Sequence, residues 1–140
     1  MRVIVGYGNE LRGEDAFGVD VIKELEKCNL KDTHLILIFQ LTPEISLDLL
    51  DASEIIFIDA CYSLENHYAL ACDIKEINSS NLTHHISPLN ILAILNGVYK
   101  KFPNYQVFSL LTNNFDTIIN KKEYINSIKQ TTKWIKNATN

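Results

Sequence analysis

Short runs of apolar, often β-branched residues recur along the chain and predict its strands. Such runs occupy residues 2–7, 34–39, 54–60 and 105–111. Residues 68–74 show a weaker pattern of period two, which favours a half-exposed or edge strand. The third run is apolar until Asp59, and an ionised acid there is costly unless it is paired, hydrogen-bonded or bound to a metal. Asp59 is therefore a candidate functional residue.

Between these runs, apolar residues spaced three or four positions apart predict amphipathic helices. Thr42-Pro43-Glu44 supplies a cap, a first-turn proline and a carboxylate that suits the helix dipole, and Ser87-Pro88 opens another helix in a similar way. The expected helices span about residues 16–28, 42–51, 88–102 and 125–135, the last followed by a polar tail.

This alternation of strand and helix predicts an α/β fold. We expect a three-layer sandwich, in which a mostly parallel twisted sheet of about five strands carries helices on both faces. The length of 140 residues fits one domain over residues 1–140. Sites in such sheets lie outside the carboxyl ends of the strands, so Asp15, Asp59 and the pair His84-His85 are expected at one rim.

Charge and cysteine content narrow the class of protein. Lys and Arg total 13 against 17 Asp and Glu, and the net charge of -4 disfavours nucleic acid and anionic membranes as partners. The three cysteines are odd in number and lack Cys-x-x-Cys spacing, which is typical of a reducing cytoplasm. No apolar run approaches the roughly 18 residues of a membrane span. We therefore expect a soluble cytoplasmic protein.

The glycines near the first strand fit neither common nucleotide motif. The third glycine of a dinucleotide fingerprint would fall at Leu11. A phosphate-binding Walker loop requires Lys-Ser or Lys-Thr where this chain has Glu14-Asp15. A Gly-x-Ser-x-Gly elbow is absent from the sequence, and Cys61 is interpreted as a small buried thiol rather than a nucleophile.

A receiver-like signalling module, with Asp59 as phosphoacceptor, is an alternative from a different class. Acids after the first strand and an Asp ending the third resemble its magnesium site. Such modules also carry a Lys at the end of the fifth strand, where this chain reads Ser109-Leu110-Leu111-Thr112.

The remaining candidates are two carboxylates and an imidazole. Such a mixed oxygen and nitrogen set suits Zn, Ni, Fe or Mn better than a thiolate-bound ion. Three protein ligands leave coordination positions open, where an ion polarises a carbonyl or lowers the pKa of water to about 7.

Three blocks of the sequence resemble the [NiFe]-hydrogenase maturation endopeptidases. The blocks occur in the family's order and are Gly6-Tyr7-Gly8-Asn9-x-Leu11-x-x-Glu14-Asp15-x-x-Gly18-Val19, Phe57-Ile58-Asp59-Ala60 and Thr83-His84-His85-Ile86-Ser87-Pro88. The stretch Gln40-Leu41-Thr42-Pro43-Glu44 further resembles the branch that serves soluble, NAD-reducing hydrogenases.

The resemblance implies both an activity and a site. The family removes a C-terminal extension from the nickel-loaded large-subunit precursor without a serine or cysteine nucleophile. Carried over by position, Asp15, Asp59 and His85 bind the nickel that the precursor supplies, and His84 is the alternative to His85. Asp15 and Asp59 are the catalytic candidates. A nickel-binding chaperone without proteolysis would use the same ligands, and other divalent metals could occupy the site in vitro.

Several other residues are expected to have structural roles or to lie at the surface. Gly8 is expected to permit a tight turn and close approach of the substrate, and Asn9 to anchor the loop or orient substrate. Glu14, one place before Asp15, is expected to cap the first helix, and the alternative is a contact that supports the metal ligands from behind. His34 and His67 are expected at the surface without identifiable partners.

Overall fold

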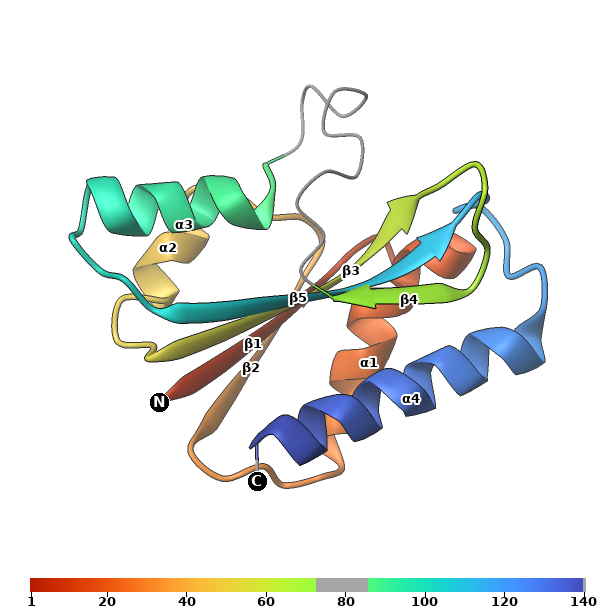
Figure 1. Cartoon of the computed structure of the whole chain (residues 1–140), viewed down its shortest axis with the longest axis horizontal. Coiled ribbons are helices and arrows are strands. Elements are labelled where there is room, and N and C mark those ends of the chain that lie inside the picture. The colour runs from red at the N-terminus through yellow and green to blue at the C-terminus, as the bar shows by residue number, and fades with distance from the viewer. Residues whose placement is uncertain (73–85, 140) are drawn as a thin grey trace.

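The computed structural model describes residues 1–72 and 86–139 and confirms the α/β prediction (Figure 1). In this part of the chain, five strands form one sheet in the order β2-β1-β3-β5-β4. The strands are β1 (Arg2–Tyr7), β2 (Thr33–Ile38), β3 (Glu54–Tyr62), β4 (Ala69–Cys72) and β5 (Asn104–Thr112). β4 lies at one edge and runs antiparallel to β5, whereas the other pairs are parallel. The edge strand is thus confirmed.

Helices cover both faces of the sheet (Figure 1). On one face lie α1 (Phe17–Glu26) and the long α4 (Lys121–Thr139), and on the other lie α2 (Ile45–Asp48) and α3 (Pro88–Gly97). A short 3-10 helix, η1 (Gly13–Ala16), leads into α1. The three-layer arrangement is therefore as predicted. Within the described residues, no helix combines the length and apolar character needed to cross a membrane.

The central strands are apolar because each faces a helical layer on either side. Alternate residues of β3 enter different cores: Ile56 and Ile58 pack with α1 and α4, whereas Ile55 and Phe57 pack with α2 and α3. All four side chains are fully buried. A continuous apolar run was therefore the correct signal for this strand.

The second predicted helix is shorter than expected. α2 comprises only Ile45–Asp48, and its N-cap is Glu44 rather than Thr42. The amide of Ile45 donates to the carbonyl of Thr42, and the amide of Ala52 to that of Leu49. These bonds join residues three apart, so tight turns replace the continuous helix predicted to residue 51.

The ends of the other helices also differ from the sequence prediction. Ser87 caps α3, with its Oγ accepting from the Asn90 amide at 3.3 Å, as expected. The helix stops at Gly97, short of the predicted residue 102, and Phe102 is 74% exposed. α4 continues through the predicted polar tail to Thr139, because helical backbone bonds do not require an apolar face.

The strand order reverses between β1 and β3. α1 connects β1 to β2 on one side, and the chain then crosses back through α2 to β3 on the other side of β1. Ligands of open α/β sheets bind where the strand order reverses, outside the carboxyl ends of the strands. The residues that follow β1 and those near the end of β3 therefore meet at this point.

Candidate functional site

Asp59 lies inside β3 rather than at its end. The sequence predicted a strand over residues 54–60 with the acid at its end, but β3 continues to Tyr62. Pairing with β5 also continues, with Asp59 opposite Ser109 and Tyr62 opposite Thr112. The Asp59 side chain is only 9% exposed. Its carboxylate is thus set back from the rim of the sheet.

Hydrogen bonds from three neighbouring side chains hold the Asp59 carboxylate. The Tyr7 hydroxyl donates to Oδ2 at 2.5 Å, and the Ser109 hydroxyl donates to Oδ1 at 2.5 Å. The Cys61 thiol also donates to Oδ1, at 3.5 Å. A carboxylate offers about four acceptor positions, so Asp59 retains capacity for a further ligand.

The pKa values of these groups follow from burial and from the neighbouring charges. Burial raises the pKa of Asp59 above its ordinary value, against the opposing effect of its hydrogen bonds from Ser109, Tyr7 and Cys61. The nearby Asp15 carboxylate raises that pKa further. Burial and the charge of Asp59 likewise raise the pKa of the Cys61 thiol. Cys61 therefore remains a thiol that donates to Asp59, which supports its interpretation as a non-nucleophile.

Asp15 is held by the loop that follows β1. The backbone amide of Asn9 donates to its Oδ2 at 3.1 Å, and the Asn9 side chain accepts from the Leu11 amide at 2.9 Å. Gly8 has φ +149°, and a Cβ there would lie 2.0 Å from the Asp15 carbonyl oxygen. The predicted tight turn at Gly8 and the loop-anchoring role of Asn9 are confirmed. Substrate binding by these two residues remains a prediction.

Glu14 was interpreted as a helix cap, and this is wrong. Its side chain is fully buried and accepts hydrogen bonds from Thr112, Tyr68 and the Ile119 amide, the last at 3.1 Å. The Nε2 atom of His67 lies 2.9 Å from Oε1. Burial acts to raise the pKa of Glu14, but these hydrogen bonds together lower it. Glu14 is therefore a buried anion that joins η1 to the region between β5 and α4.

His67 was expected at the surface without a partner, and its contact with Glu14 corrects that prediction. Tyr68 stacks on the His67 ring with centroids 4.0 Å apart. The Tyr68 hydroxyl accepts from the Asn120 amide at 2.7 Å and donates to Glu14. Burial and the contact with Glu14 raise the pKa of Tyr68 to about 12. Tyr68 thus stays protonated and bridges Glu14 to the start of α4.

The charge of Asp15 reaches Asp59 and raises its pKa, but the third predicted ligand is not tested. His84 and His85 lie outside the described residues. Among the residues that are described, no three His, Cys, Asp or Glu side chains form a group able to hold a metal ion. The predicted nickel set of Asp15, Asp59 and His85 therefore stays a prediction.

Two site residues were missed at the sequence level. Tyr7 and Ser109 lie on β1 and β5, the strands that flank β3, and each donates to Asp59. Ser109 carried a weak signal, because it is a polar residue within an apolar run. Tyr7 belongs to the first block that resembles the family, but a tyrosine at a strand end is usually part of the core, so its contact with Asp59 was not predicted.

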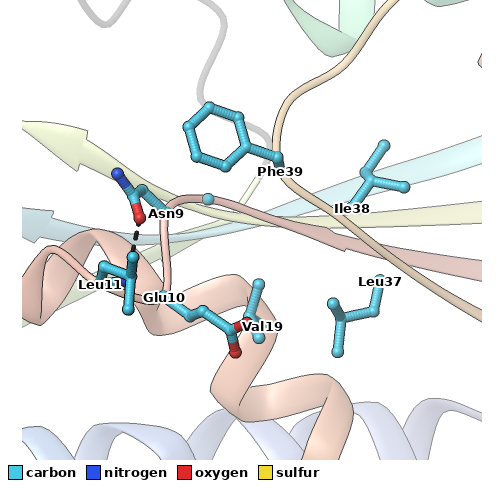
Figure 2. Close-up of a pocket in the computed structure, with 8 residues that line it drawn as sticks. Asn9, Glu10, Leu11, Val19, Leu37, Ile38 and Phe39 are labelled. Atoms are coloured by element: carbon cyan, nitrogen blue, oxygen red, sulfur yellow. Dashed lines mark hydrogen bonds between the residues drawn. The ribbon is translucent and has the colours of Figure 1, made fainter.

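A pocket of about 220 Å³ adjoins the Asp15 loop (Figure 2). Its walls come from the loop after β1, from Val19 of α1 and from the end of β2. The lining residues are Gly8, Asn9, Glu10, Leu11, Val19, Leu37, Ile38 and Phe39. Leu11 and Phe39 are 90% and 63% exposed, so large apolar side chains surround the opening.

Comparison with known proteins identifies a sequence relative of this chain. No protein-family model matches the sequence. A protein of Methanocaldococcus jannaschii, assigned as a hydrogenase maturation protease, is 34% identical to this chain. The match covers 77% of this chain and 69% of the relative.

Solved structures share the fold. The hydrogenase maturating endopeptidase HybD of Escherichia coli superposes with a TM-score of 0.72 at 20% identity, over 96% of this chain and 88% of its own. A hydrogenase 2 maturation peptidase from Thaumarchaeota archaeon SCGC_AB-539-E09 superposes with a TM-score of 0.69 at 20% identity, over 98% of this chain and 96% of its own. The [NiFe] hydrogenase maturation protease HybD of Thermococcus kodakarensis superposes with a TM-score of 0.68 at 15% identity, over 99% of each chain. At these identities the likeness establishes the fold alone.

Proposed function

Because this chain belongs to the hydrogenase maturation protease family, as its 34% identical relative shows, we propose that it cleaves a [NiFe]-hydrogenase large-subunit precursor. The cleavage removes the C-terminal extension of the nickel-loaded precursor. The enzyme recognises the precursor's nickel through Asp15, Asp59 and His85. The nickel is part of the substrate, so a precursor without it is not processed.

The observation that carries this proposal is the pair of carboxylates at the reversal of the strand order. Among the residues that the structure describes, the hydrogen-bonding partners of Asp59 are the uncharged side chains of Tyr7, Ser109 and Cys61. The repulsion between Asp15 and Asp59 raises the pKa of Asp59 and therefore disfavours two negative charges there. A divalent cation would relieve this repulsion, and carboxylate oxygens suit Ni²⁺ when an imidazole completes the set.

Peptide hydrolysis at this site requires positioning and activation of water. Contact with the precursor's ion would place the scissile bond beside Asp15 and Asp59. Either carboxylate, or the ion itself, could polarise the attacking water. The water adds its oxygen to the carbonyl carbon, the C–N bond breaks, and the leaving amine takes up a proton. This would be aspartyl-type chemistry, with the Cys61 thiol a hydrogen-bond donor to Asp59.

Family membership favours the protease over the receiver-like module. β5 also carries no lysine that could contact a phosphoryl group on Asp59. A nickel-binding chaperone shares the proposed ligands and differs in leaving the precursor's mass unchanged. The assignment to the branch that serves soluble, NAD-reducing hydrogenases, and a cytoplasmic location, are further parts of the proposal.

Mass spectrometry of the precursor tests the activity directly. We expect the nickel-loaded precursor to lose its C-terminal extension on incubation with the enzyme, and the nickel-free precursor to keep it. Asp59→Asn should abolish processing, because the amide has nearly the same shape but no negative charge. If neither precursor form loses mass with the wild-type enzyme, the proposed cleavage of that partner is wrong.

A control variant tests whether loss of a carboxylate outside the proposed site also impairs processing. Asp51 is exposed and lies just before the amino end of β3, at the opposite end of the strand from Asp59. We expect Asp51→Asn to process the precursor at the wild-type rate. Full activity of Asp59→Asn would remove this carboxylate from the mechanism.

A further inference from the structure

The pocket beside the Asp15 loop has an apolar character that the cleavage chemistry does not explain. Val19, Leu37, Ile38 and Phe39 supply apolar side chains to its wall (Figure 2). Leu37 and Phe39 are 40% and 63% exposed at the end of β2. Large apolar groups that gather around a hollow, rather than standing singly, mark a binding site.

One loop connects the pocket to the proposed catalytic site. Gly8 and Asn9 line the pocket, and the Asn9 amide also donates to the Asp15 carboxylate at 3.1 Å. The Gly8 amide donates to the Ile38 carbonyl at 3.3 Å, which fixes the loop against β2. A peptide that crosses this loop would therefore have one part beside Asp15 and the next part over the pocket.

Charge and size indicate what the pocket holds. Glu10, a charged residue of the lining, forms an ion pair with Lys23 at 3.0 Å, so its charge is balanced. The volume is about 220 Å³. An apolar cavity of about 150 Å³ accepts one benzene, whereas pockets for drug-sized ligands measure about 300–1,000 Å³. The space thus fits one large apolar side chain better than a complete small molecule.

We infer that this pocket is a specificity subsite for an apolar side chain of the precursor, close in sequence to the bond that is cut. The inference rests on the proposed function. Phe39 and Leu11 form the outer wall of the subsite, and Val19 its inner wall. The subsite selects the substrate by contact with the polypeptide, independently of the precursor's nickel.

Steady-state kinetics with the nickel-loaded precursor test the subsite. We expect Phe39→Ser to raise KM about 10-fold or more with kcat within twofold, since the loss of apolar contact in a pocket weakens binding about 10–200-fold. Phe102→Ser is the matched control, because Phe102 is 74% exposed and precedes the amino end of β5. Its kinetics should equal those of the wild type. Leu11→Ser, at a residue 90% exposed, provides a second variant that leaves the core intact.

Substrate variants identify the occupant. Each apolar residue near the cut in the precursor is changed to serine in turn. One change should lower kcat/KM about 10-fold with the wild-type enzyme and have little further effect with Phe39→Ser. An unchanged KM for both Phe39→Ser and Leu11→Ser, with a wild-type enzyme that cleaves, would overturn the subsite and leave the proposed function standing. A wild-type enzyme that cleaves nothing would overturn both.

Discussion

Two adjacent acids, Glu14 and Asp15, have opposite environments in this protein. Glu14 is fully buried and hydrogen-bonded to His67 and Tyr68 just before β4, to Thr112 of β5 and to the approach to α4, whereas Asp15 is half-buried. The sequence alone could not separate their roles. The partners of Glu14 lie between 53 and 105 residues away along the chain, and a local pattern carries no information about them.

At the residue scale, we predict that Glu14 is a major contributor to stability. Glu14→Ala should lower the free energy of unfolding by at least about 2 kcal/mol, because each buried donor left without an acceptor costs about 1–3 kcal/mol. Urea denaturation measures this difference. Glu26→Ala, at an exposed position of α1, should change stability by no more than about 0.5 kcal/mol. Equal stability of the two variants would show that the Glu14 contacts contribute little.

At the scale of elements, the first turn of α1 packs unusually close to the backbone of the sheet. A Cβ at Gly18 would lie 2.3 Å from the Ile58 carbonyl oxygen and 2.7 Å from the Tyr7 carbonyl oxygen. The first turn of α1 therefore lies directly against β1 and β3. This contact fixes the helix start, and with it η1 and Asp15, next to the strand that carries Asp59.

The close contact leads to a paired prediction for two helical glycines. Gly18→Ala should lower the free energy of unfolding by about 1–3 kcal/mol, since the added methyl group forces α1 away from the sheet. Gly97, the last residue of α3, has no atom within 4 Å of an added Cβ. Gly97→Ala should raise stability by about 0.4–1 kcal/mol. Thermal or urea unfolding distinguishes the two, and a destabilised Gly97→Ala would contradict this account.

Periodicity predicted the strands better than the helix ends. Central strands were recognised because burial on both faces leaves a continuous apolar run, as at Ile55, Ile56, Phe57 and Ile58. The end of β3 was missed because its pairing with β5 persists through Tyr62 although apolar character stops at Asp59. Helix ends depend on backbone bonds, such as those around α2, that side-chain patterns do not record.

At the scale of the whole molecule, the family motifs predicted Asp15 and Asp59 as site residues, and the topology explains why the segments that carry them are neighbours. Residues after β1 and inside β3 converge because these strands are neighbours in the sheet. The strand order itself depends on long-range pairing, so the sequence predicted the architecture and one common rim without specifying the neighbours of each strand. His85 remains a sequence prediction.

Binding of free Ni²⁺ should stabilise the whole fold without any precursor. A ligand that binds only the folded state raises the free energy of unfolding by about 2.7 kcal/mol at 100 times its dissociation constant. Thermal unfolding across a Ni²⁺ titration measures this effect. Asp51→Asn should respond as the wild type does, whereas Asp59→Asn should respond weakly. A wild-type melting temperature that does not depend on Ni²⁺ would contradict recognition of nickel by these side chains.

The burial of Glu14 determines how short a functional version of this protein can be. The conspicuous motifs all fall within the first hundred residues, so a truncated fragment of that length would contain every proposed ligand. Such a fragment would lack Thr112 and the Ile119 amide, and the buried carboxylate would lose two of its donors. The C-terminal forty residues are thus a structural requirement for the N-terminal motif, and a minimal protease excised at the motif boundaries would not keep Asp15 in place.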